Sequence, residues 1–97
     1  MQDLENVIGR VVATRRRRLG LTQEALAEAT GLHPTYISLV ERGLRCPSTR
    51  VLIALAEGLG AKPSNLMVSI ERELAKVEAK PRTAGKKRPF QRKRDGR

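Results

Sequence analysis

The chain has 97 residues, which is enough for one small domain and a short additional segment. Tyr36 and Phe90 are its only aromatic residues, so a core must be built from Leu, Val, Ile and Ala. Twenty Lys and Arg against ten Asp and Glu give a net charge of +10, which indicates an anionic partner such as nucleic acid. Residues 80–97 carry +8 of this charge and residues 1–79 only +2.

Several classes of protein do not fit this composition. Cys46 is the only cysteine and His33 the only histidine, which excludes an internal disulfide and argues against a metal site. The apolar runs are far shorter than the ~20 residues of a membrane span. The first residues, MQDLENVIGR, do not resemble a signal peptide. With no phosphate loop and no base beside a nucleophile, we expect a cytoplasmic, nucleoid-associated protein without enzymatic activity, cofactor, metal or membrane contact.

Apolar residues at three- and four-residue steps predict a first helix near the N-terminus. Gly20 ends it, and the four arginines before Leu19 stand in its last turn, where cations are favourable. The apolar stripe is formed by Leu4, Val7, Ile8, Val11, Val12 and Leu19.

A second helix is short. Thr22 can cap its N-terminus, and Gly31 interrupts the pattern after about eight residues. Leu26 and Ala29 are expected to face inward.

A third helix begins near Pro34, which suits a first helical turn, although His33 is not a favoured cap. Two short helices joined by a Gly-containing turn predict a helix-turn-helix over about 22–43. Of the third helix, Ile37, Val40 and Leu44 are expected on the core side. Thr35, Ser38, Leu39 and Arg42 stand at i, i+3, i+4 and i+7, which places them together on the other side.

This second face is small and mostly uncharged. A helix that enters the major groove of DNA needs narrow side chains, because they let its backbone approach the base edges. The alternative is the solvated face of an ordinary amphipathic helix, and this helix alone does not decide between the two. The two short paired helices and the net positive charge of the chain favour binding to DNA.

Two further helices follow, one after Ser48 and one over about 63–78. The last has an apolar stripe that could fold onto the domain itself or pair two copies of the chain. We expect its first half to do the former and its second half the latter. From Pro81 the apolar pattern disappears, so an all-α domain over 1–79 is predicted to be followed by a disordered basic tail, 80–97. The stripe consists of Met67, Ile70, Leu74 and Val77.

The stretch LGLTQEALAEATGLHPTYISLVERGLRCPSTRVLIALAEGLG resembles the Cro/cI-type (Xre-like) helix-turn-helix domain of phage repressors and bacterial regulators. The resemblance rests on LTQEALA, the turn at Gly31, YIS followed by ERG, and PS before LIALAEGLG, and it covers roughly residues 4–70. It implies a five-helix, lambda-repressor-like fold with the third helix as recognition helix. Most such proteins bind double-stranded DNA as dimers, on half-sites ~34 Å apart.

The resemblance also implies roles for individual residues. Arg16 and Glu41 match positions that form an ion pair between the first and third helices. Gln23, where a helix N-terminus suits an anion, matches a phosphate-binding position; the alternative is an exposed, helix-favouring side chain. Tyr36 either reaches a phosphate or packs against the second helix. The remaining matches are base-facing positions at His33, Pro34, Thr35, Ser38 and Leu39, and phosphate positions at Arg42 and Arg45.

The base-facing set is chemically unusual. Many relatives carry Arg, Lys or Gln where this chain has Pro34, and only Arg42, at the far end, could pair with a base edge in a bidentate manner. Such pairing is worth ~1–3 kcal/mol per base. We therefore predict modest direct base recognition, with much of the selectivity left to DNA shape.

The basic tail is predicted to lie along DNA as an electrostatic arm. Two alternatives remain. In one, the protein is an antitoxin or another interaction module whose tail binds a partner protein. In the other, the tail binds RNA and the helix-turn-helix only folds. The leading hypothesis is a dimeric, sequence-preferring DNA-binding regulator, most simply a repressor.

Overall fold

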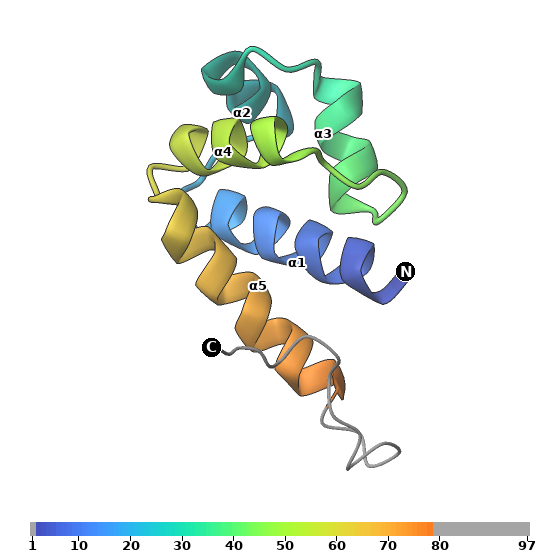
Figure 1. Ribbon diagram of the computed structural model, residues 1–97. Coiled ribbons are helices and arrows are strands. Elements are labelled where there is room, and N and C mark those ends of the chain that lie inside the picture. Colours follow the sequence, from blue (N-terminus) through green and yellow to red (C-terminus); the bar gives the residue numbers. More distant parts are fainter. Residues whose placement is uncertain (1, 79–97) are drawn as a thin grey trace.

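The computed structural model describes residues 2–78 and contains five α-helices and no strand over that range. The predicted all-α, five-helix fold is confirmed. The tail at 80–97 lies outside the described residues. The helices are α1 (Gln2–Arg18), α2 (Gln23–Thr30), α3 (Pro34–Glu41), α4 (Thr49–Gly58) and α5 (Pro63–Glu78) (Figure 1).

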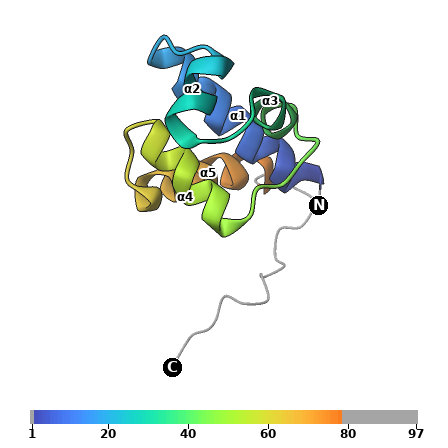
Figure 2. The same cartoon turned by 90° about the horizontal axis from the view of Figure 1, so that it is seen from above.

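Each helix has its main contacts with two others. Helix α1 packs against α3 and α5, while α2 packs against α3 and α4, and α4 against α5. Figures 1 and 2 show α1 with α3 on one side and α5 on another. All five helices contribute aliphatic side chains to one core, as the lack of aromatic residues requires. The largest fully buried side chains are Leu26, Ile37, Leu55, Leu66, Ile70, Val7, Val12 and Val40.

The contact between α1 and α3 depends on a glycine. A Cβ atom at Gly9 would overlap the carbonyl oxygens of Val40 and Glu41 at the end of α3. Backbone oxygens cannot move aside as a flexible side chain can. Gly9 therefore lets α1 approach the last turn of α3 closely and fixes where that helix lies.

Local capping sets the limits of the two short helices. The Thr22 hydroxyl accepts a hydrogen bond of 2.9 Å from the Ala25 N–H, as predicted for a cap. Gly31 ends α2 in the left-handed conformation, at φ +77°. His33 also acts as a cap, because its Nδ1 accepts from the Thr35 N–H at 3.0 Å. Histidine is not a favoured cap, but a neutral imidazole nitrogen can serve as the acceptor.

Three apolar residues predicted to face the core are exposed. Leu19 and Leu44 follow the last residues of α1 and α3 and are 54% and 60% exposed. Helical periodicity no longer applies once a helix has ended, which is why the pattern misplaced them. Ala29 is exposed because α2 meets the core through Leu26 and Ala27.

Candidate nucleic-acid interface

The two sides of α3 have different surroundings. Ile37 and Val40 are completely buried. On the opposite side Thr35 is exposed, and Ser38 and Leu39 are partly exposed. Thus three of the four side chains that the spacing grouped together lie on the open side of a helix of about two turns.

The ends of this outer face carry the other predicted base-contacting residues. His33 is exposed beside the first turn, and Pro34 is half-buried within it. At the other end Arg42 is exposed, and its Nε donates a long hydrogen bond of 3.3 Å to the Ser38 hydroxyl. Ser38 accepts this bond, so its own hydroxyl proton stays available for another acceptor.

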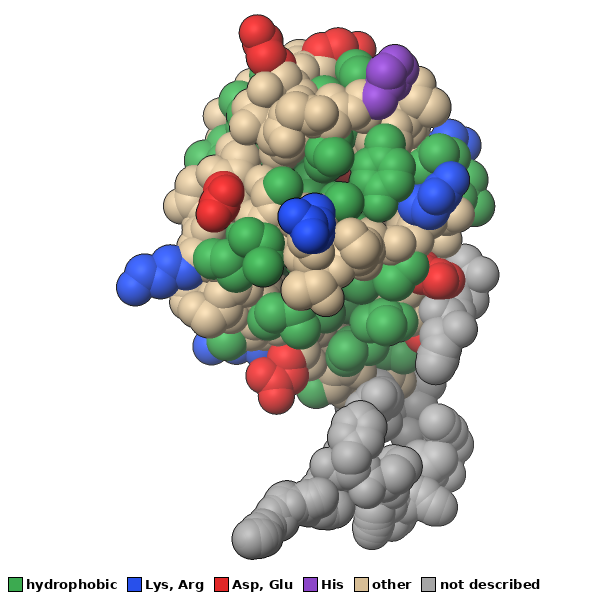
Figure 3. All heavy atoms as spheres, turned by 45° about the horizontal axis from the view of Figure 1, so that its top comes forward, with side chains coloured by type: hydrophobic (Ala, Val, Ile, Leu, Met, Phe, Trp, Pro, Cys, Tyr) green, Lys and Arg blue, Asp and Glu red, His purple; other side chains and the backbone are tan. Residues whose placement is uncertain are grey.

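Figure 3 shows the molecule turned so that the α2–α3 end comes forward. Apolar side chains, in green, and tan surface, which comprises backbone and uncharged polar side chains, cover most of this face, and charged side chains are scattered between them. A face of this kind lets a helix backbone approach a base edge, but offers few groups for bidentate pairing.

Tyr36 of α3 and Arg45, which follows the helix, lie together. The Arg45 Cζ lies 5.8 Å from the centre of the Tyr36 ring, within the range of a cation–π contact. The ring is partly buried and packs against the core. Tyr36 thus supports an exposed arginine just after the end of α3.

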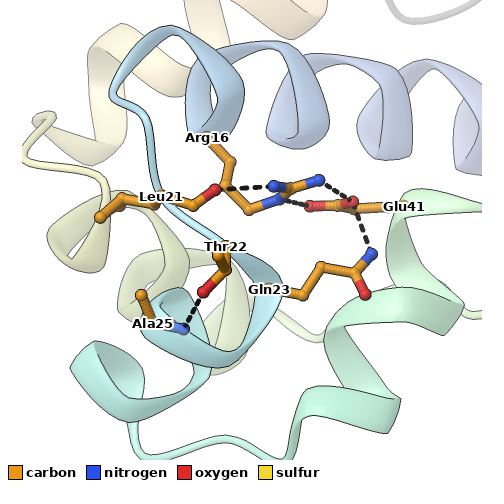
Figure 4. Close-up of polar contacts among 6 residues, drawn as sticks. All are labelled: Arg16, Leu21, Thr22, Gln23, Ala25 and Glu41. Atoms are coloured by element: carbon orange, nitrogen blue, oxygen red, sulfur yellow. Dashed lines mark hydrogen bonds and ion pairs between the residues drawn. The ribbon is translucent and has the colours of Figure 1, made fainter.

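The inner side of α3 ends in a polar network, drawn in Figure 4. The Arg16 guanidinium donates two hydrogen bonds to the Glu41 carboxylate, Nε to Oε2 at 2.6 Å and Nη2 to Oε1 at 3.0 Å. Its Nη1 donates to the Leu21 carbonyl oxygen at 2.7 Å. The two side chains are only 11% and 5% exposed. Arg16 of α1 therefore holds both the last residue of α3 and the segment that leads into α2.

The electrostatics of this pair are consistent with its burial. The hydrogen bond to Glu41 raises the pKa of the Arg16 guanidinium above its ordinary value, against the opposing effect of partial burial. A raised pKa means that folding favours the charged form, so Arg16 contributes this stability at every pH below its ordinary pKa. The paired carboxylate also presents no free negative charge beside an approaching phosphate.

Gln23 takes part in the same network. Its Nε2 donates to Glu41 Oε1 at 2.9 Å. Neither sequence interpretation of Gln23, a phosphate contact or an exposed helix-favouring side chain, included this bond, since the two residues are 18 positions apart. A side-chain amide nitrogen has two N–H groups, so one remains available for an outside acceptor.

The structure divides the apolar stripe of α5 differently from the expectation. In its first half Ile70 is 1% exposed and fills the core of the single chain, as expected, so it cannot take part in a dimer contact, whereas Met67 is 48% exposed. In its second half Leu74 and Val77 are half-buried against the core. Ile53 of α4, which the sequence did not single out, is 41% exposed.

Comparison with known proteins agrees with this geometry. A family model described as helix-turn-helix matches residues 12–66, which contain α2, α3 and α4 entirely. The control protein C.SmaI of Serratia marcescens is 38% identical over 65 residues, covering 67% of this chain and 77% of that protein. The chain belongs to the Cro/cI-type (Xre-like) helix-turn-helix family. It is a DNA-binding transcriptional regulator of that family.

Solved structures of such regulators have the same fold. The clp gene regulator ClgR from Corynebacterium glutamicum superimposes with a TM-score of 0.72 at 29% identity, covering 78% of this chain and 81% of ClgR. The restriction-modification controller protein C.Esp1396I superimposes with a TM-score of 0.69 at 30% identity, covering 73% and 93%. That protein was crystallised as a tetramer in complex with its natural 35 base-pair operator.

Two other kinds of site, a metal-ligand cluster and a membrane-spanning helix, are absent from residues 2–78. Over residues 2–78 no three His, Cys, Asp or Glu side chains gather as metal ligands would. None of the described helices is both long and apolar enough to cross a membrane.

Proposed function

We propose that this regulator binds its operator as a homodimer, represses transcription, and inserts the segment 33–43, with α3 at its centre, into the major groove. One observation carries this proposal: the outer side chains of α3 are exposed or partly exposed, while Ile37 and Val40 on its inner side are completely buried. On this basis the protein resides in the cytoplasm on the nucleoid.

Base recognition falls to short side chains. The methyl groups of Thr35 and Leu39 can contact thymine methyls, and the Ser38 hydroxyl can bond to either kind of base edge. His33 and Pro34 border the same groove contact at the start of α3. Since only Arg42 has a guanidinium to offer a base, direct recognition is modest and the shape of the operator contributes the rest.

Phosphate contacts surround this face. Glu41 holds the Gln23 amide at the N-terminus of α2, and the second N–H of that amide, together with free backbone N–H groups, can meet a phosphate. Tyr36 and Arg45 form a second phosphate site, in which the ring supports the guanidinium. Arg42 can leave its long bond to Ser38 for a third.

Dimerisation is assigned to the exposed apolar side chains of α4 and α5. Met67 and Ile53 are exposed on two helices that contact each other. Met67 belonged to the stripe predicted from the sequence; Leu74 and Val77 retain part of their surface and can extend the contact. A dimer brings two copies of α3 to half-sites ~34 Å apart. The oligomeric operator complex of C.Esp1396I supports this arrangement by analogy.

The basic segment 80–97, outside the described residues, is assigned to the DNA backbone. Deleting it should flatten the slope of log affinity against log salt, because each neutralised phosphate contributes about 0.9 to that slope. The preferred sequence should not change. An unaltered slope, or co-purification of a small partner protein that depends on this segment, would instead favour the antitoxin-type alternative.

The experiment for the whole proposal is nuclease footprinting on the DNA upstream of the protein's own gene. We expect two protected half-sites separated by about one helical turn. Equal affinity for this DNA, random DNA and RNA would contradict the proposal.

A further inference from the structure

A groove of about 340 Å³ lies between α1 and α5. We call it the α1–α5 groove. Its cations come from both helices, and Glu73 is the only carboxylate that lines it. A second hollow continues it toward Lys62 and shares Arg15 and Arg72 with it. The cations of the first hollow are Arg10, Arg15, Arg18, Arg72 and Lys76.

Positive charge is concentrated in this groove. Residues 1–79 contain eleven Lys and Arg and nine Asp and Glu, so this part of the chain is nearly neutral. Six of the eleven basic residues line the two hollows, but only one of the nine acidic residues does. The outer face of α3, by contrast, has Arg42 alone. A concave surface of one sign attracts a partner of the opposite sign.

Contacts among residues 2–78 engage only some of these cations. The Glu73 carboxylate forms ion pairs with Lys76 Nζ at 3.1 Å and with Arg10 Nε at 4.0 Å. Arg15 Nη2 donates to the Ser69 hydroxyl at 2.8 Å, which holds the guanidinium in the groove and leaves its other N–H groups available. Arg18 and Arg72 form no hydrogen bond or ion pair with any residue from 2 to 78.

The spacing of the cations indicates the shape of the partner. Arg10 and Arg18 are eight residues apart on one helix, which is ~12 Å along its axis. Charges spread over this length suit an extended chain better than a compact ion. An extended peptide presents a side chain to the same face every ~6.6 Å, and a guanidinium matches a carboxylate with two parallel hydrogen bonds.

Nucleic acid fits the groove less well. No aromatic side chain lines either hollow, so bases would have nothing to stack on. A double helix is too wide to enter a groove between helices that pack directly, whose axes are ~8–10 Å apart.

We propose that the α1–α5 groove binds an extended, acidic segment of a partner protein, whose carboxylates pair with Arg15, Arg18 and Arg72. Helix α1 stands between this groove and α3 (Figure 1). The regulator can therefore hold the acidic segment while α3 is in contact with DNA. This contact is separate from the proposed DNA-binding function and does not require it.

The test uses the full chain and a fluorescent (Glu-Ser)5 peptide, with (Gln-Ser)5 as neutral control. The double variant Arg18→Gln/Arg72→Gln removes the two cations of the groove that have no partner among residues 2–78. The control Arg17→Gln/Arg50→Gln removes the same charge from exposed residues that do not line it. We expect about fivefold weaker peptide binding for the groove variant and less than twofold for the control. Equal losses in the two variants would overturn the proposal.

Amide chemical shifts locate the peptide directly. On adding (Glu-Ser)5 to the isotope-labelled chain, shifts are expected at 10–18 and 62–76 and not at 33–42. Shifts confined to 80–97 would show that the tail captures the peptide, and groove shifts produced by duplex DNA instead would show a nucleic-acid site; either result overturns the proposal. Operator affinity of the groove variant, measured in parallel, tests the DNA-binding function separately.

Discussion

The inner and outer sides of α3 differ in how firmly their side chains are held. On the inner side Ile37 and Val40 are completely buried, and two residues from other elements hydrogen-bond to Glu41. On the outer side Thr35 is exposed and Ser38 partly exposed, and the only bond between side chains there is the long one from Arg42. The buried contacts on the inner side fix the position of α3. Its outer side chains therefore need not stabilise the fold and are available for the proposed recognition of DNA.

The largest effect is expected at Glu41. Replacing it with alanine leaves the Arg16 guanidinium largely buried without its carboxylate and deprives Gln23 of its acceptor. The free energy of unfolding should fall by about 3 kcal/mol in urea denaturation. The double variant Arg16→Met/Glu41→Leu, which removes both charges, should recover much of this loss. If Glu41→Ala changed stability by less than about 0.5 kcal/mol, the inner side would not be held as described.

A somewhat smaller loss is expected for Gly9→Ala. The added methyl group meets the carbonyl oxygens of Val40 and Glu41, so α1 and α3 must separate. We expect a loss of about 2 kcal/mol by thermal or urea unfolding, together with weaker operator binding because α3 moves. Arg17→Ala, on the exposed surface of α1, is the matched control and should remain within about 0.5 kcal/mol. Equal stability of the two variants would contradict the close approach.

Changes on the outer side should alter recognition without unfolding the protein. Pro34→Arg places a guanidinium at the start of α3, where it can pair with O6 and N7 of guanine. We expect roughly tenfold preference for guanine over the other bases at one position of each half-site, measured by competition with operator variants. No change in base preference would place Pro34 outside the groove.

The smallest effect is expected for Thr35→Ala. This change removes one methyl and one hydroxyl from the exposed face, so the free energy of unfolding should stay within about 0.5 kcal/mol. Operator affinity should fall about fivefold in a gel-shift titration, because a single thymine-methyl contact is lost. A loss of stability as large as that of Gly9→Ala would mean that Thr35 belongs to the inner side.

Much of this architecture follows from local sequence. Thr22 and Ser48 cap helices as their types predict, and Pro34 and Pro63 stand at the first helical positions. Periodicity misplaced Leu19 and Leu44, which lie beyond the helix ends, and Ala29 and Met67, which lie within α2 and α5 but are exposed. Local patterns say which side of a helix is apolar, but not whether it meets its own domain or a second chain.

The features that sequence reasoning missed are tertiary. Gln23 and Glu41 meet only because the turn at Gly31 folds α2 against α3. The charges of the α1–α5 groove lie on helices more than 40 residues apart, so their gathering is invisible before the chain is folded. Net charge points to the tail, whereas six of the eleven basic residues of 1–79 line the hollows beside α1 and α5.

The most direct test of the account is selection of binding sites from randomised DNA, performed with the wild type and with Thr35→Ala/Ser38→Ala. We expect two short half-sites about one helical turn apart, with weak base preferences in each that the double variant loses while the spacing persists. Long, sharply defined half-sites, or identical sites for both proteins, would contradict the assignment of base recognition to the open face of α3.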